Sequence, residues 1–256
     1  VEFPEDSIPL NHEPLLKEPS DLANLVSPDP ATGPRMSDRL EAVRLMREQV
    51  GGEVPILGWV EGALAQAADL RGVNEIMLDL AMQPEWVEEL LERCAAVEIA
   101  FAKAQVEAGA DIIGLGDAVA SLVSPAMYRQ YALPYEKRIF EAVHEMGALC
   151  RLHICGNTNQ ILADMVETDA DIIDLDWMVD LKKAAEVFGD KAAPCGNFDP
   201  VAVVLQGTPQ QVHDAVLECA DLGSDRWFCG AGCEIPDGTP EENLHAQTQA
   251  LREIGA

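Results

Sequence analysis

A histidine and a cysteine stand two residues apart in the stretch "RLHICGN", residues 151–157. The stretch ends an otherwise apolar run and leads straight into a glycine. Side chains alternate along a strand, so Arg151, His153 and Cys155 are expected on one face of it. An imidazole and a thiolate side by side at a strand end are suited to bind a metal ion.

A third ligand is expected from the end of another strand. In "RWFCGAGCEIP", Cys233 directly follows the apolar run at 226–232. One imidazole and two thiolates are zinc ligands, and three protein ligands leave a fourth position for a substrate. Two thiolates and a neutral imidazole cancel the charge of Zn²⁺, and such a centre can hold a substrate thiol as a nucleophilic thiolate. The pattern predicts a catalytic zinc site formed by His153, Cys155 and Cys233.

These residues also have a structural interpretation. A lone His-x-Cys is more often an ordinary strand histidine beside a buried cysteine. The chain has seven cysteines, an odd number in a chain long enough to fold without disulfides, which favours a reducing, cytoplasmic setting. Five of them are expected in helices or strands as small hydrophobic residues: Cys94, Cys150, Cys195, Cys219 and Cys229.

Short apolar runs alternate with helical segments along the chain. The expected strands are 54–60, 110–116, 148–155, 170–176, 192–199 and 226–232. The expected helices are 37–49 (capped by Ser37), 63–109 (broken near Pro84), 124–147 (broken before Pro134), 159–167, 180–189, 208–223 and 239–255. Two of these helices are expected to open with a Thr-Pro cap.

This alternation predicts an α/β fold of parallel strands with helical crossovers. A (β/α)8 TIM-type barrel fits best, and a doubly wound sheet is the second choice. We expect a single domain over residues 1–256, with a proline-rich segment of extended and loop structure over 1–34. Because a full barrel has eight strands, we expect that part of the N-terminal region is absent or that one or two strands lie unrecognised in 1–30. A barrel would gather the metal ligands on one rim.

The charge balance excludes some classes of partner. The chain has 45 acidic and 17 basic residues, a formal net charge of −28. Such an acidic surface disfavours nucleic acid and anionic lipid. No run of about 18 apolar residues is present, so no membrane-spanning segment is expected.

Several motifs resemble one known family. "HICGN", "IIDLDWMVDLKKAAEVFGD", "GNFDP" and "GAGCEIPDGTPEENL" resemble the uroporphyrinogen decarboxylase superfamily. They look most like its zinc-dependent branch, the methylcobamide:coenzyme M methyltransferases. The resemblance covers nearly the whole chain, and it implies a (β/α)8 barrel whose members are usually longer at the N-terminus.

The resemblance implies transfer of a methyl group from a methylated corrinoid (cobamide) to a thiol such as coenzyme M. Zinc would hold the thiol as thiolate, the thiolate would attack the cobalt-bound methyl group, and cob(I)alamin would leave. The implied partners are a small thiol and either a corrinoid protein or free methylcobalamin. The sequence does not fix the oligomeric state, and a homo-oligomer is one alternative.

Further residues at strand ends are candidates for the site. Asp176, in "LDW", is either a fourth zinc ligand when substrate is absent or a solvent-facing or helix-capping acid, and Glu234 is a weaker candidate. In the same way Asn197, Asp199 and Asp117 either line the cofactor pocket or order their loops.

Two charged residues near the site bear on the substrate. Arg151 either offsets the charge of an anionic thiol or forms an ion pair with a barrel acid such as Asp174 or Asp176. Glu61 and Ala63 stand where the family commonly has a small residue and proline. A carboxylate at the rim would turn the pocket away from sulfonates such as coenzyme M.

Two other functions compete with this interpretation. A decarboxylase of the uroporphyrinogen type would have several pocket arginines and a Gly-His-Gly after the last strand, where this chain has Gly232-Cys233-Glu234. A non-catalytic corrinoid- or metal-binding accessory protein would bind zinc without turnover. A purely structural zinc site would not leave an open position.

Overall fold

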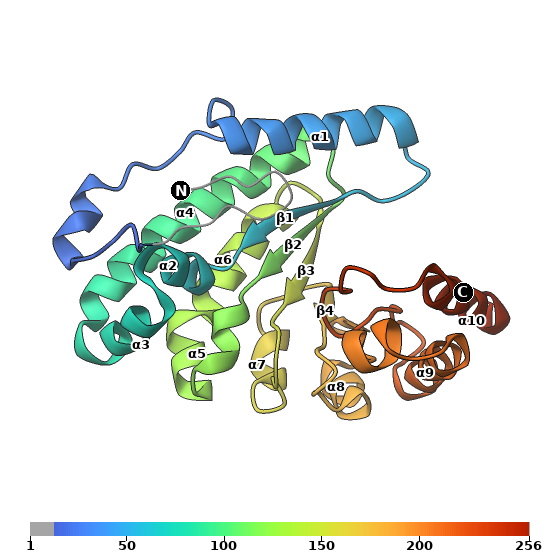
Figure 1. Ribbon diagram of the computed structural model, residues 1–256. Helices are drawn as coiled ribbons and strands as arrows, with labels where there is room; N and C mark the ends of the chain where they lie inside the picture. The colour runs from blue at the N-terminus through green and yellow to red at the C-terminus, as the bar shows by residue number, and fades with distance from the viewer. Residues whose placement is uncertain (1–12, 256) are drawn as a thin grey trace.

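A parallel sheet surrounded by helices forms the framework of the chain (Figure 1). The structure, a computed structural model, describes residues 13–255. Its five-stranded sheet consists of β1 (Leu57–Glu61), β2 (Ile112–Gly116), β3 (Leu149–His153), β4 (Ile172–Asp174) and β5 (Ala193–Cys195). The strands pair in chain order and all run parallel. A doubly wound sheet would reverse its strand order, so the fold is of the TIM type.

The segment 226–232 continues this sheet only in part. Isolated parallel bridges join Cys195 to Phe228 and Phe198 to Ala231. The prediction of a regular strand here is wrong, and the glycines at 230 and 232 give the physical reason, since glycine weakens a strand. Within residues 13–255 no strand joins this segment to β1, so the described part of the barrel is open on that side.

The helices agree with the predicted segments, with shifted ends. They are α1 (Pro34–Val50), α2 (Ala63–Arg71), α3 (Val73–Met82), α4 (Pro84–Ala108), α5 (Pro125–Tyr131), α6 (Leu133–His144), α7 (Leu162–Val166), α8 (Leu181–Phe188), α9 (Pro209–Leu222) and α10 (Glu241–Ile254). The breaks expected near Pro84 and before Pro134 are confirmed. A further break, between α2 and α3, falls at Gly72, whose φ of 96° lies outside the helical region.

Two of the predicted helix caps are wrong. Ser37 lies inside the first turn of α1, because Gly33 is the N-cap and Pro34 is already at the first helical position. Thr208 does cap α9, where it forms a capping box with Gln211. Thr239 does not cap α10: the N-cap is Pro240, and the Thr239 hydroxyl donates to the Pro236 carbonyl over 2.8 Å.

The proline-rich N-terminal segment is described only from residue 13. It contains the 3₁₀ helix η1 (Pro19–Asn24) before α1 begins. Of the two alternatives for the missing strands, the one that places them within 1–30 is not met over residues 13–30, where no strand occurs, and residues 1–12 lie outside the described part. Two shorter elements were also not predicted: the 3₁₀ helix η2 (Ala118–Leu122) and the π-helix η3 (Pro200–Leu205).

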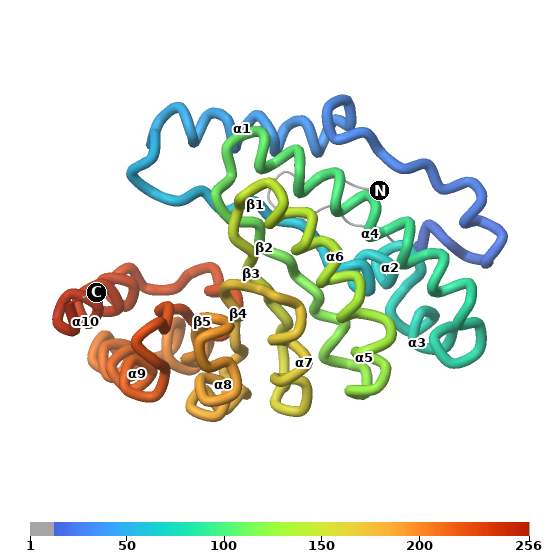
Figure 2. The backbone as a smooth tube through the Cα atoms, turned by 180° about the vertical axis from the view of Figure 1, so that it is seen from behind, coloured from blue at the N-terminus to red at the C-terminus, as the bar shows by residue number. Residues whose placement is uncertain are grey.

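The helices form two groups that cover the outer face of the sheet. Figures 1 and 2 show α1 to α6 along β1 to β3, while α8, α9 and α10 lie together at the other end. The main hydrophobic core lies between these helices and the outward side chains of the strands, such as Ile113, Leu115 and Leu152. The inner face of the sheet is more open: Trp59 is 39% exposed and Leu149 is 48% exposed.

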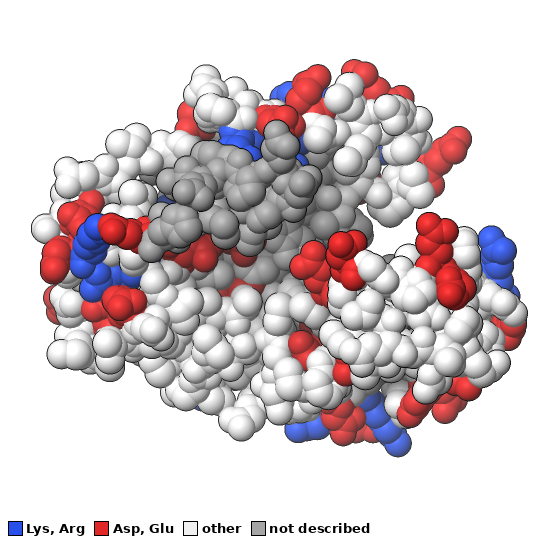
Figure 3. Space-filling model, in the orientation of Figure 1, with Lys and Arg blue, Asp and Glu red and all other residues white. Residues whose placement is uncertain are grey.

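The surface is acidic, as the composition predicts. On the face drawn in Figure 3 acidic side chains are scattered, and the basic ones stand in small groups beside them. Among the helices within residues 13–255, none is both long enough and apolar enough to cross a membrane.

Two carboxyl groups are enclosed behind the end of β2. Asp117 and Glu136 are fully buried and interact with each other, and one oxygen of each, Asp117 Oδ2 and Glu136 Oε1, has no hydrogen-bond donor among the described residues. Asp117 also accepts from the Ala65 N–H at the start of α2 over 3.0 Å, and the Tyr128 hydroxyl donates to Glu136 over 2.6 Å. Burial raises the pKa of Asp117 to about 7, and it raises the pKa of Glu136 well above its ordinary value. The folded pair therefore holds a proton that the unfolded chain would release.

This pair makes a prediction about stability. Both pKa values are raised on folding, so the contribution of the pair is full below about pH 4 and is lost as the pH rises from there through the raised pKa values of the folded state. Glu136→Gln replaces the shared proton by a permanent amide donor. We expect it to increase the free energy of unfolding at pH 8 by about 1 kcal/mol and to change it little at pH 5. Urea unfolding at both pH values measures this. Glu141→Gln, on the exposed side of α6, is the control, and an equal effect at both pH values would contradict the account.

Candidate metal centre

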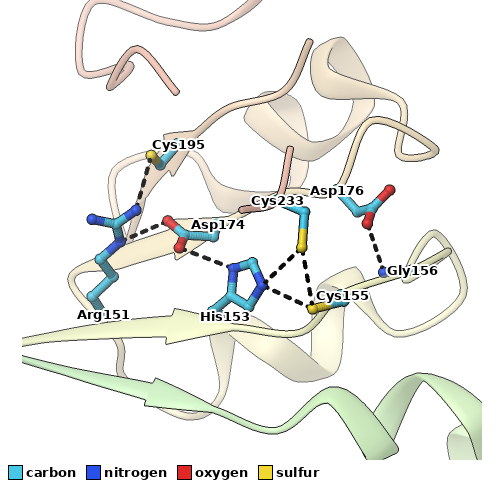
Figure 4. A network of polar contacts seen from close by, with 8 residues as sticks. All are labelled: Arg151, His153, Cys155, Gly156, Asp174, Asp176, Cys195 and Cys233. Carbon is cyan, nitrogen blue, oxygen red and sulfur yellow. Dashed lines mark hydrogen bonds and ion pairs between the residues drawn. The ribbon is translucent and has the colours of Figure 1, made fainter. Parts of the chain in front are cut away.

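His153, Cys155 and Cys233 come together at the carboxyl ends of the strands (Figure 4). His153 is the last residue of β3, Cys155 follows it in the loop, and Cys233 follows the segment 226–232. His153 Nε2 lies 3.0 Å from the Sγ of Cys155 and 3.9 Å from that of Cys233. The two sulfur atoms are 3.6 Å apart. All three side chains are half-buried, so they remain accessible to a small ligand.

Close backbone approaches place the two cysteines. The Gly156 N–H donates to Asp176 Oδ2 over 2.9 Å, which ties the loop of Cys155 to the end of β4. A Cβ atom on Gly232 would lie only 2.2 Å from the Trp177 nitrogen. Only glycine therefore allows the loop before Cys233 to pass this close to the β4 end.

Asp174 orients the histidine. It lies in register with His153 on the neighbouring strand, and its Oδ2 is 3.1 Å from His153 Nδ1. Its Oδ1 accepts from Arg151 Nε over 2.8 Å. The N–H of the neutral imidazole is then on Nδ1, and the lone pair on Nε2 faces the two sulfurs. Of the two roles considered for Arg151, the structure shows the ion pair with Asp174.

The electrostatics favour charged forms of these groups. Burial would lower the pKa of His153, but hydrogen bonds with Asp174 and Cys155 outweigh it and raise the pKa to about 11. The His153 hydrogen bond lowers the pKa of the Cys155 thiol. Both shifts favour an imidazolium beside a thiolate, and binding of a metal ion would displace the imidazolium proton.

The donor set fits a tetrahedral zinc ion. Ligands about 2.3 Å (sulfur) and 2.0–2.1 Å (nitrogen) from zinc would lie about 3.5–3.8 Å from one another. The observed separations of 3.0, 3.6 and 3.9 Å bracket these values, so small side-chain rotations suffice. Three protein ligands would leave one coordination position for a substrate.

The structure does not bring the predicted fourth ligands into this cluster. Asp176 is buried, and its oxygens accept from the backbone N–H groups of Gly156 and Met178. It thus orders the loops at this rim, which resembles the capping role considered for it. Glu234 is exposed and is not among the residues whose ligand atoms lie within 4.8 Å of one another.

The residues predicted to line a cofactor pocket are engaged in local structure. Asn197 Nδ2 donates to the carbonyls of Asp176 and Val179. The Asp199 carboxylate caps η3, because its Oδ1 accepts hydrogen bonds from the backbone N–H groups of Val201 and Ala202. Asp117 is enclosed beside Glu136. Each takes the loop-ordering or structural role of the two considered.

The other cysteines differ from the pair at the rim. Cys94, Cys150, Cys195 and Cys219 are buried, and Cys229 is half-buried. Burial raises the pKa of all five thiols. A second group of ligand type, His144, Cys150 and Asp171, lies at the opposite end of β3. Its polar atoms are already used: His144 Nε2 lies 2.9 Å from Asp171, which also accepts the Cys150 N–H.

Sequence reasoning missed the orienting role of Asp174. From the sequence, Asp174 is expected only as an ion-pair partner of Arg151. In the motif "IIDLD" the first acid is the last residue of β4, and the parallel register pairs it with His153, the last residue of β3.

Comparisons with known proteins identify a family and several relatives of this chain. The uroporphyrinogen decarboxylase (URO-D) family profile matches residues 1–254. The methylcobamide:CoM methyltransferase MtbA of Methanosarcina acetivorans is 37% identical over 215 residues, which cover 83% of this chain and 62% of that protein. A uroporphyrinogen decarboxylase of Chlorobium luteolum is 31% identical over 206 residues, covering 78% of this chain and 58% of that protein.

A solved structure is similar as well. A methyltransferase from Methanosarcina mazei superposes with a TM-score of 0.85 at 33% identity, covering 92% of this chain and 69% of that chain. The chain spans about three fifths of the length of the two curated relatives.

The geometry predicts that Asp174 controls metal affinity through His153. Asp174→Asn removes the charge that holds Nδ1–H, so we expect the affinity for Zn²⁺ to fall about 10- to 100-fold. Competition with a chromophoric chelator measures this, and circular dichroism checks the fold. Asp221→Asn, at the exposed end of α9, is the matched control. An unchanged affinity would show that Asp174 does not orient the ligand.

Proposed function

The chain belongs to the uroporphyrinogen decarboxylase family, and we propose that it is a zinc-dependent methyltransferase that moves a methyl group from a methylated corrinoid to a thiol. The observation that carries the proposal is the cluster of His153, Cys155 and Cys233. A methylcobamide:CoM methyltransferase is 37% identical to this chain, which supports the same class of reaction.

Each residue of the centre has a defined task. Asp174 keeps the His153 Nδ1 proton in place, so that Nε2 is free to bind the metal. Cys155 and Cys233 supply two thiolates, which with a neutral imidazole balance the charge of a divalent ion. Zinc, when bound, would supply the electrophilic centre that stabilises a substrate thiolate near neutral pH. Asp176 holds the loop of Cys155 against the end of β4.

The transfer itself joins the substrate sulfur to the methyl carbon. The S–C bond forms as the Co–C bond breaks, and the electron pair stays on cobalt. The methyl donor must therefore approach over the strand ends, opposite the bound thiol. Trp177 and Met178 are 50% and 42% exposed directly after Asp176, which supports docking of a corrinoid or its carrier protein at this rim.

Free thiols are compatible with this chemistry. All seven cysteines are unpaired, which supports our proposal that the protein works in the reducing cytoplasm.

The decarboxylase and the accessory protein are the two other functions considered, and each predicts a different behaviour. Decarboxylase relatives occur at 31% identity, but decarboxylation of a tetrapyrrole carboxylate gives no role to a cluster of two thiolates and an imidazole. An accessory protein would bind zinc and a corrinoid without turning over.

The function predicts zinc-dependent demethylation of methylcobalamin in the presence of a thiol. Anaerobic, zinc-loaded protein should convert methylcobalamin to cob(I)alamin, followed by absorption, and form the methyl thioether, followed by mass spectrometry. Cys155→Ala and Cys233→Ala should each reduce the rate about a hundredfold or more, because each removes a ligand.

The control is Cys229→Ala, whose half-buried thiol faces Gln247 and not the cluster. It should leave the rate unchanged. Zinc binding without demethylation would favour the accessory protein, and decarboxylation of uroporphyrinogen would favour the decarboxylase.

A further inference from the structure

The indole of Trp59 lies flat across the inner face of β2. A Cβ atom on Gly114 would lie 2.4 Å from a ring carbon of Trp59, and one on Gly116 would lie 2.8 Å from another. The glycines of the motif "IIGLG" are therefore required by the ring that covers them. Trp59 is nevertheless 39% exposed, so one face of the ring is covered by β2 and the rest remains accessible.

This ring lies beside the metal centre. The ring centroids of Trp59 and His153 are 6.2 Å apart. Glu61, Gly116 and His153 are in register on three neighbouring strands, so the side chains of Glu61 and His153 point to the same face. Gly116 has no side chain between them. Trp59, Glu61 and His153 thus lie on the same face of the sheet, with the Trp59 ring next to the histidine.

Glu61 places a carboxyl group beside this ring. Trp59 Nε1 donates to Glu61 Oε1 over 3.1 Å, which fixes the carboxylate at the edge of the ring. Burial raises the pKa of Glu61, which disfavours its ionised form, whereas a cation placed beside it would favour that form. The backbone N–H of Glu61 is bound by Glu98, so the strand end is held in place.

The arginines nearest to Trp59 and Glu61 lie in two different surroundings. Arg151 is committed to Asp174. Arg39 lies on α1, exposed, across a hollow of about 450 Å³ that Trp59 and Glu61 also line. Asp176 adds a further negative charge at the rim. The balance around the metal ligands is therefore negative among the described side chains.

We infer that the thiol acceptor carries a positively charged group, as an aminothiol does, and that Trp59 and Glu61 bind this group. The inference rests on the proposed function, since it concerns the acceptor of that reaction. An aromatic face next to a carboxylate is a recognition site for ammonium groups. A two-carbon chain between sulfur and nitrogen spans about 4 Å, a length suited to the short separation between Trp59 and His153. A sulfonate in the same place would be repelled by Glu61.

Three thiols of equal length test this inference. They are 2-aminoethanethiol, 2-mercaptoethanol and 2-mercaptoethanesulfonate, which place a cation, a neutral group and an anion on the same two-carbon chain. Protein loaded with Co²⁺ in place of zinc reports binding of a thiol by a new sulfur-to-metal absorption band. Titration gives a dissociation constant for each thiol without any turnover.

The aminothiol should bind about tenfold more tightly than the sulfonate in the wild-type protein. Glu61→Gln keeps an oxygen for the Trp59 N–H, so the fold is preserved while the charge is lost. In this variant the ratio of the two constants should approach one. Glu186→Gln, on the exposed side of α8, is the control and should keep the wild-type ratio.

Two results would overturn the inference while leaving the proposed function intact: tighter binding of the sulfonate, which would point to Arg39, or an unchanged ratio in Glu61→Gln. If the metal binds but none of the three thiols produces the band, the proposed function itself fails, and this inference fails with it.

Discussion

The Asp174 carboxylate divides its two oxygens between Arg151 and His153, and the geometry of the metal centre depends on that division. One oxygen neutralises the arginine, and the other fixes the tautomer and the plane of the imidazole. Burial would raise the pKa of Asp174, but the hydrogen bonds from His153 and Arg151 outweigh it and hold the pKa below its ordinary value. The carboxylate therefore stays ionised, and His153 Nε2 stays directed at the two sulfurs.

This arrangement is possible because two parallel strands and the segment 226–232 all end at the same rim of the sheet. β3 supplies His153 and Cys155, β4 supplies Asp174, and the loop after 226–232 supplies Cys233. Gly232 lets that loop pass against the backbone of Trp177, while Asp176 ties the β4 end to the loop of Cys155. The inner face beside the centre is shaped by Trp59 over the β2 glycines. The metal ligands and the Trp59 ring are thus positioned by neighbouring segments of one sheet.

Sequence alone predicted the parts that follow from periodicity and strand direction. Alternation along a strand put Arg151, His153 and Cys155 on one face, and parallel strands put Cys233 on their rim. It did not settle Asp117, Asn197, Asp199 or Asp176, because an acid or amide at a strand end serves a ligand and a backbone N–H or carbonyl equally well. Only the position of the neighbouring chain decides between these roles. The segment 226–232 was overestimated as a strand because its apolar residues conceal the effect of its two glycines.

The most direct test of the metal centre is X-ray absorption at the zinc edge, on protein purified anaerobically and measured for zinc content. We predict about one zinc per chain, bound by two sulfur atoms and at least one imidazole nitrogen, with lighter atoms completing the shell. In Cys233→Ala one sulfur should be lost from that shell. A protein that neither contains nor takes up zinc, or a zinc shell without sulfur, would contradict the account.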